Sequence, residues 1–497
     1  MDGGVPVPAK STYFLARWLF LRGLALVFAV AFLSYFVQVD GLVGSRGILP
    51  IAEFLARVRA ATGRAEIAEL PTLCWFAASD ASLHAQCIAG LLISTALFLG
   101  YAPRACLVLL WALYLSLAVA GQDFLWFQWD ALLLETALFA IPFAPGRWTP
   151  DLAREQPPSA ASLLLLRWLL FRLMFASGVV KLTSGDPSWG FSDLSALTFH
   201  WWSQPLPTVF GWYAAQMPLS LQRASCAVMY AIEIGFPWLA FGTRRMRRIA
   251  CAGLVFLQLV IALTGNYGFF NLLSIVLCVA LLDDALLARL VPRALAERAQ
   301  APRDLRRAPL ALRIAGLALA GFAVLFTGAK LLENVGLVDE IPGALVSIDA
   351  CVAPCRSLSD YGLFRVMTKQ RREIEIQGSD DGVEWKPYPF RWKPGDVERP
   401  PAWCAPHMPR LDWQMWFAAL APAQRSRWLA PLVDRLLEGS PDVLDLFAAN
   451  PFAVRPPRAV RAVLYDYRFT SGEEHAATGA WWKRTELGTF LPPRFRR

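Results

Sequence analysis

Long apolar segments fill the first two-thirds of the chain, and they restrict its fold more than any other feature. A helix needs about 20 mostly apolar residues to cross a hydrocarbon core ~30 Å thick. The segments predict about nine transmembrane helices, at roughly 18–38, 83–100, 105–120, 126–143, 162–182, 224–241, 249–264, 267–283 and 310–331. Composition agrees, because 56% of the 497 residues are hydrophobic and only 18% are charged. We therefore expect a polytopic α-helical membrane protein with a multi-span domain over residues 1–331.

The positions of the arginines orient these helices. A net charge of +9 is compatible with a nucleic-acid partner, but the arginines gather in short loops between apolar segments, so we expect none. Cytoplasmic loops of membrane proteins carry an excess of Lys and Arg. With a cytoplasmic N-terminus, nine helices place Arg104 and the basic loops 144–161, 244–248 and 284–309 inside. The loops 39–82 and 183–223, with everything after 331, then lie outside.

The compartment follows from this topology and from composition. Arg outnumbers Lys and Ala is abundant, which favours a GC-rich bacterial genome. The expected location is the bacterial inner membrane, with the C-terminal domain in the periplasm. In a eukaryote the equivalent location is the endoplasmic reticulum membrane, with that domain in the lumen.

Residues 332–497 are richer in charge and turn residues, and they predict a soluble, extracytoplasmic α+β domain. Alternation of polar and apolar residues at 371–377 predicts a strand. Turn residues at 379–382 and a second apolar run at 383–392 predict a β-hairpin. We further expect a helix over 411–439 and a strand over 460–469. The domain is therefore expected to contain a β-sandwich-like sheet with inserted helices.

Several ionisable residues lie within the apolar segments, among them Asp130, Glu135, Arg172 and Glu233. Such residues are costly in a membrane and are functional candidates by default. One interpretation is structural, with Glu135 or Glu233 pairing with Arg172 so that neither charge is left alone. The other is a polar pocket for a substrate or a proton.

Lys181 ends the fifth segment at its outer edge, and His200 follows in the next outer loop. A lysine held in a dry environment can act as a base, so these two residues are the catalytic candidates. The alternative is a lysine whose ammonium reaches the headgroup region while its stem stays in the membrane.

The nine cysteines do not form a disulfide framework. Five of them lie in apolar segments, while Cys351 and Cys355 form a short Cys-x-x-x-Cys pair in the predicted aqueous region. That pair is a possible local disulfide in an oxidising compartment. Adding Cys404 and His407 would give a zinc ligand set, but the spacing is irregular, and we expect no metal and no cofactor. Nucleotide-binding and hydrolase signatures are absent from the sequence.

Several motifs over most of the chain resemble the lipase maturation factor family. In the membrane part these are at 41–50, 126–136, 184–189, 204–207 and 264–271. In the C-terminal part they are at 361–368, 378–382 and 406–417. The run Pro-His-Met-Pro-Arg-Leu-Asp-Trp at 406–413 is the longest and most unusual of them.

The resemblance implies a membrane protein that helps newly exported lipases to fold and mature, with membrane lipids and an exported lipase or another secreted client as partners. It implies no particular oligomeric state. Asp186, Trp189 and Gln204 carry the outer-loop motif, and Arg410, Asp412, Trp413 and Trp416 are candidates for client contact. One departure is the run Phe-His-Trp-Trp-Ser at 199–203, where the family usually has an acidic residue.

The membrane half is also distantly similar to the transmembrane domain of vitamin K-dependent gamma-carboxylases. On that likeness Lys181 occupies the position of a catalytic lysine. The chain therefore has two candidate functions: a non-enzymatic maturation factor, or a membrane enzyme that uses Lys181 as a base on a lipid-soluble or exported substrate.

Overall fold

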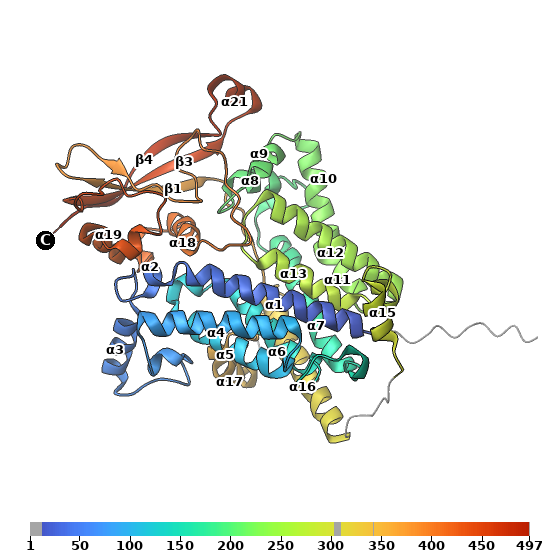
Figure 1. The fold of residues 1–497 in the computed structure, drawn as a ribbon. Coiled ribbons are helices and arrows are strands. Elements are labelled where there is room, and N and C mark those ends of the chain that lie inside the picture. The colour runs from blue at the N-terminus through green and yellow to red at the C-terminus, as the bar shows by residue number, and fades with distance from the viewer. Residues whose placement is uncertain (1–11, 303–309, 341, 497) are drawn as a thin grey trace, which may run out of the picture.

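The computed structural model describes residues 12–302, 310–340 and 342–496, and its elements are labelled in Figure 1. Among these residues, six helices are long and apolar enough to cross a membrane. They are α1 (Phe14–Phe36), α4 (Asp80–Leu99), α5 (Pro103–Ala120), α7 (Ala160–Leu182), α12 (Arg244–Thr264) and α16 (Leu310–Asn334). The chain is thus an integral membrane protein, but the prediction of nine spans is not confirmed.

The three remaining predicted spans form shorter or interrupted helices. α6 (Gln128–Phe143) has 16 residues, a length of about 24 Å, which is less than a hydrocarbon core. α13 (Phe270–Cys278) with the 3-10 turn Val279–Leu281 is shorter still. The third runs through α10 (Leu219–Tyr230), a π-helical turn at Ala231–Gly235, and α11 (Phe236–Leu239).

Small residues allow the membrane helices to pack closely. Close packing matters in a membrane because the hydrophobic effect does not drive helices together in lipid. Gly90 of α4 is the clearest case, because a Cβ atom there would lie 2.5 Å from the ring of Phe32 on α1. The α1 helix also packs on α13. Its 23 residues span about 34 Å and connect the two ends of the bundle.

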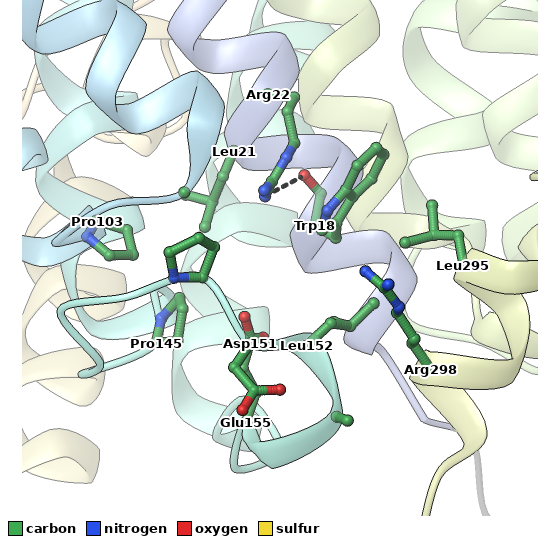
Figure 2. Close-up of a pocket in the computed structure, with 13 residues that line it drawn as sticks. Trp18, Leu21, Arg22, Pro103, Pro145, Asp151, Leu152, Glu155, Leu295 and Arg298 are labelled. Carbon is green, nitrogen blue, oxygen red and sulfur yellow. Dashed lines mark hydrogen bonds between the residues drawn. The ribbon is translucent and has the colours of Figure 1, made fainter.

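The loops expected in the cytoplasm meet at the end of the bundle where α1 begins. There Arg17 pairs with Glu155 at 2.6 Å, and Arg248 pairs with Asp283 at 3.0 Å. Figure 2 shows a pocket of about 330 Å³ at this end, between α1, the loop around Asp151 and α15 (Arg293–Gln300). Residues 303–309 of the basic 284–309 loop lie outside the described residues.

Short helices make up the outer loops and the connections. They are α2 (Val39–Val43), α3 (Ile51–Thr62), α8 (Ala196–Ser203), α9 (Val209–Ala215), α14 (Asp284–Leu287) and α17 (Gly343–Val352). α17 is apolar and is followed by Arg356, which donates to the carbonyl oxygen of Ala118 on α5 at 2.9 Å. Residues just after 331 therefore pack on the helical bundle rather than on the sheet.

The C-terminal domain contains one antiparallel sheet with the order β2-β1-β3-β4. Its strands are β1 (Arg371–Ser379), β2 (Lys386–Pro387), β3 (Ala459–Phe469) and β4 (Trp482–Phe495). Its helices are α18 (Arg410–Ala419), α19 (Leu429–Glu438), α20 (Pro441–Leu444) and α21 (Gly472–Thr478). Figure 1 shows α18 and α19 between the sheet and the end of α1. The described residues form a single sheet backed by helices, so the expected β-sandwich is wrong.

Prolines explain where the other predictions for this domain fail. The strands expected at 371–377 and 460–469 are present as β1 and β3. The run 383–392 forms only two strand residues, because Pro387 and Pro389 cannot donate to a ladder. The helix expected over 411–439 is two helices, since Pro422 disfavours helical geometry at the residue before it. The edge strand β4 was not predicted, and it contains Pro492 and Pro493.

Candidate functional site

The first polar cluster joins the sheet domain to the membrane bundle. Arg410, the first residue of α18, bonds both carboxylate oxygens of Asp130 on α6, at 2.6 and 2.8 Å. Tyr114 on α5 donates to the same carboxylate at 2.6 Å. All three side chains are buried. Because a two-bond Arg–carboxylate contact fixes orientation as well as distance, this cluster holds α18 in one position on the bundle.

The residues before Arg410 bind the end of α1. The backbone N–H of Met408 donates to the hydroxyl of Ser34 at 2.8 Å, and that hydroxyl also lies 3.0 Å from Nδ1 of His407. Gln38 donates to the Met408 carbonyl at 3.0 Å and accepts from the Arg410 N–H at 2.8 Å. The unusual motif at 406–413 therefore lies at the contact between the sheet domain and the bundle.

His407 makes this contact sensitive to acid. Burial, with Arg410 and Arg391 nearby, lowers the pKa of His407 from 6.5 to about 4. Between pH 6.5 and about 4 the unfolded chain therefore binds more protons than the folded chain, and stability falls as pH falls. We expect the thermal midpoint of the purified protein to drop over this window, and we expect His407→Gln to reduce the drop. An unchanged pH slope in His407→Gln would contradict the assignment.

The expected client-contact residues are not at the surface, which corrects that prediction. Asp412 accepts hydrogen bonds from the backbone N–H groups of Trp392 and Lys393, both at 2.9 Å. Trp413 packs edge-on against Trp129 of α6, with ring centroids 4.8 Å apart. Trp416 donates to the Ser203 carbonyl at 2.9 Å. With Arg410 they form a buried seam between the domains, so none of the four presents a side chain to a client.

The second polar cluster lies inside the bundle. Arg172 on α7 pairs with Glu135 on α6, one of the two partners expected for it. Tyr361 donates to the other oxygen of Glu135 at 2.6 Å, and Arg172 donates to the Ser359 carbonyl at 2.9 Å. Glu135 and Arg172 are almost fully buried. This cluster therefore fixes residues 359–361, which lead into the sheet domain, against two membrane helices.

The third cluster contains Glu233 and Lys181. Nζ of Lys181 lies 2.6 Å from a Glu233 carboxylate oxygen and 2.9 Å from the Ser177 carbonyl. Glu233 lies in the π-helical turn, a feature often found at functional sites. Gly178 permits this approach, since a Cβ atom there would lie 2.6 Å from Ile234. Lys181 is thus an ion-paired residue within the protein and does not extend to the headgroups.

Lys181 and His200 line one cavity, but no hydrogen bond joins them in the part of the chain that the structure describes. The cavity has a volume of about 510 Å³. Burial and the charge of Lys181 lower the pKa of His200 from 6.5 to about 3, so its imidazole is neutral at physiological pH. The two residues predicted to be catalytic therefore line the same cavity, His200 as a neutral imidazole and Lys181 in an ion pair with Glu233.

The outer-loop motif residues connect this region to the sheet domain. Asp186 accepts from Ser188 at 2.8 Å and from the Met367 N–H at 2.8 Å. Burial opposes ionisation, but these hydrogen bonds outweigh it and lower the pKa of Asp186 below its ordinary value. Trp189 is buried in the cavity wall. Gln204 accepts from Tyr267 at 2.8 Å and donates to the Thr264 carbonyl at 2.9 Å.

Arg371 also links the two domains, although the sequence pattern predicts it only as part of a strand. It is fully buried and donates to the carbonyl oxygens of Trp202, Gln204 and Pro205. The same guanidinium pairs with Glu373 at 2.6 Å. The sequence carried no signal for this role, because Arg371 lies on the polar face of the strand, in alternation with Glu373 and Glu375.

The cysteines of the C-terminal part do not make the predicted bond. Cys351 and Cys355 are both free thiols, and Cys351 is exposed on the apolar helix α17. The expected disulfide is therefore not formed, and these residues lie beside the bundle instead of in an aqueous domain. In the described ranges no group of three or more His, Cys, Asp or Glu side chains has the arrangement of a metal site.

Together these contacts define the class of protein: a multi-helix membrane protein whose sheet domain is fixed to one end of the bundle by a buried ion pair and buried hydrogen bonds. Residues 15–289 match the lipase maturation factor transmembrane domain, and residues 357–492 match the lipase maturation factor C-terminal domain. The chain belongs to the lipase maturation factor family.

Curated relatives match over nearly the whole chain. Lipase maturation factor 2 of Homo sapiens is 35% identical, over 96% of this chain and 82% of its own length. The Gallus gallus protein of the same name is also 35% identical, over 96% and 81%. Lipase maturation factor 1 of Mus musculus is 34% identical, over 97% and 87%. No solved structure matches the chain.

Proposed function

We propose that this protein assists the folding and maturation of exported lipases, the role in the names of its relatives. The observation that carries the proposal is that both family domains match in order and that the relatives match at least 95% of this chain. The buried contacts of Arg410, Arg371 and Arg172 add a physical argument. They hold the sheet domain in a fixed position at one end of the bundle. A domain held in this way presents a constant surface to a client that emerges from the membrane.

The proposed location is the bacterial inner membrane, with the sheet domain in the periplasm. Two structural features support this orientation. The basic loops meet where α1 begins, and Ser34 and Gln38 near the end of α1 bind the sheet domain. Because positive loops are retained in the cytoplasm, the sheet domain is then on the exported side. We place the division between the membrane domain and this domain near residue 331, with α17 as a connecting segment.

Phe210 and Trp403 are better candidates for client contact than the buried residues of α18. Phe210 lies on α9 and Trp403 in the sheet domain, with ring centroids 6.2 Å apart. Their side chains are 52% and 48% exposed. Exposed aromatic groups of this kind favour contact with apolar segments of a partner. The pair lies beyond the membrane helices, where an unfolded client would be accessible.

The enzymatic alternative has less support. A general base must be within reach of the substrate proton, and Nζ of Lys181 is already engaged by the Glu233 carboxylate and the Ser177 carbonyl. His200 lines the same cavity, and it makes no hydrogen bond to Lys181 that would relay a proton. Family membership also favours the maturation factor.

The proposal is tested by co-expressing a secreted lipase with this protein in a bacterial host that lacks it. We expect the specific activity of the secreted lipase, measured per unit of lipase antigen, to rise with the wild-type protein. Phe210→Ser with Trp403→Ser should remove most of that gain while membrane insertion and thermal stability stay unchanged. The matched control is Val454→Ser, an exposed apolar residue of the same domain.

Two results would count against the proposal. Equal specific activity with and without the protein, across several secreted lipases, would remove the maturation role. Full activity of the double variant would instead remove Phe210 and Trp403 from client contact and leave the maturation role standing.

A further inference from the structure

The cavity of about 510 Å³ lies within the size range of small-molecule sites, ~300–1,000 Å³. It lies between α7, α8, α10 and α12, and its lining is mostly apolar. Typical lining residues are Leu173, Leu197, Met229 and Ile261. Such a lining with a few polar groups is the usual composition of a site for an apolar ligand with one polar end.

The polar groups in the wall carry no net charge. Lys181 and Glu233 compensate each other as an ion pair, and His200 is neutral. Gln258 is uncharged; its amide oxygen accepts from the Asn271 side chain at 2.8 Å, and its amide nitrogen lies 3.7 Å from the sulfur of Met174. A charged ligand would have to break the Lys181–Glu233 pair in a low-dielectric site, which is costly. The wall therefore favours an uncharged ligand.

His200 supplies unused hydrogen-bonding capacity to this wall. Neither ring nitrogen has a hydrogen-bond partner among the residues that the structure describes. A neutral imidazole has one N–H donor and one acceptor nitrogen. The ring is held edge-on against Phe364, with centroids 4.8 Å apart. Phe364 has a φ of +55°, rare for a bulky residue, and such strain is concentrated at binding sites.

The cavity is accessible from the side of the bundle. Leu221 and Val228 on α10 and Phe256 on α12 all line it, and each is at least half exposed on the outer surface of the protein. α12 is one of the helices able to cross a membrane, so its exposed apolar face lies in lipid. An opening between α10 and α12 therefore leads to the bilayer, which points to a membrane lipid as the occupant.

We propose that this cavity binds an uncharged single-chain lipid, such as a monoacylglycerol, which enters from the bilayer between α10 and α12. Its chain packs on the apolar lining, and its hydroxyl or ester carbonyl group hydrogen-bonds to His200. The Lys181–Glu233 pair closes the polar end of the site without accepting a charged headgroup. The inference concerns a ligand site and does not depend on a lipase client.

The test uses the full-length protein in lipid nanodiscs and a monoacylglycerol with a photoactivatable diazirine in its chain. After illumination, peptide mass spectrometry should find the label concentrated on the cavity-lining residues of α10 and α12, and excess unlabelled monoacylglycerol should compete it away. Ala224→Trp, at a lining position of α10, should abolish this labelling. The control Ala227→Trp changes an exposed position of the same helix outside the lining and should leave it intact.

His200→Phe keeps the shape of the ring but removes its hydrogen bonds. Loss of one hydrogen bond, ~1 kcal/mol, should weaken competition by unlabelled monoacylglycerol about fivefold. Label spread evenly over lipid-facing helices and insensitive to Ala224→Trp would overturn the site. Preferential labelling of the cavity by a diazirine fatty acid, which is anionic, would overturn the inference of an uncharged ligand.

Discussion

Arg410→Met should destabilise the protein by ~3–5 kcal/mol, the usual effect of removing one partner of a buried ion pair. The substitution leaves the Asp130 carboxylate buried with only Tyr114 and a weaker backbone contact. Because this pair joins α18 to α6, the sheet domain should detach from the bundle before the bundle unfolds. Unfolding in mixed micelles measures the loss, and faster limited proteolysis of the sheet domain reports the detachment.

The double variant separates the ion pair from a general packing effect. Asp130→Asn with Arg410→Met removes both charges, so it should be less destabilised than the sum of the two single variants by ~1–3 kcal/mol. Arg494→Met is the matched control, because Arg494 pairs with Asp434 at the surface of the same domain and exposed pairs contribute ~0–1 kcal/mol. Additive losses in the double variant would contradict the coupling.

Arg172→Met should have an effect of similar size, ~3–5 kcal/mol, but at a different place. Glu135 would remain fully buried between α6 and α7, with Tyr361 and the Ser359 N–H as its remaining donors. The expected result is local opening of residues 359–361 and a lower thermal midpoint of the bundle. Hydrogen exchange at these residues measures the opening, because the peptide that contains Tyr361 should lose its protection.

Arg223→Met is the control for Arg172, since Arg223 pairs with Asp193 in the partly exposed outer loop. Its effect should be under ~1 kcal/mol. Tyr361→Phe should fall between the two, because it leaves one oxygen of Glu135 with only the longer hydrogen bond from the Ser359 N–H, at 3.3 Å. A loss below ~1 kcal/mol for Arg172→Met would mean that water or lipid headgroups reach Glu135, and that the cluster is open instead of sealed.

The membrane class was predictable because hydropathy depends on local composition alone. The six long spans, α1, α4, α5, α7, α12 and α16, match predicted segments closely. The weaker segments failed for identifiable reasons, since α6 is too short and the stretch from α10 to α11 contains a π-helical turn and Pro237. Local composition does not reveal how packing shortens or interrupts a helix.

For the polar residues, too, the sequence identified the residues themselves but not what they contact. Asp130, Glu135, Arg172, Lys181 and Glu233 were identifiable because an ionisable group in an apolar segment is rare. Their partners were not, because Asp130 pairs with a residue 280 positions away and Glu233 with one 52 positions away. The 406–413 motif was misinterpreted for a related reason. Its Trp413 suits either a surface that binds a client or a buried seam, and only the contact with Trp129 of α6 distinguishes the two.

The apolar segments by themselves determined that this chain lies in a bilayer, because hydropathy is a local sum over neighbouring residues, and the arginine loops likewise predict an orientation from local charge. Tertiary structure decided which charges compensate each other, that α18 joins the domains, and that Lys181 and His200 share one cavity. Those outcomes depend on side chains from distant segments meeting where water is excluded. An unpaired charge is strongly destabilising in such a place, so the position of its partner decides which contact each charged residue makes.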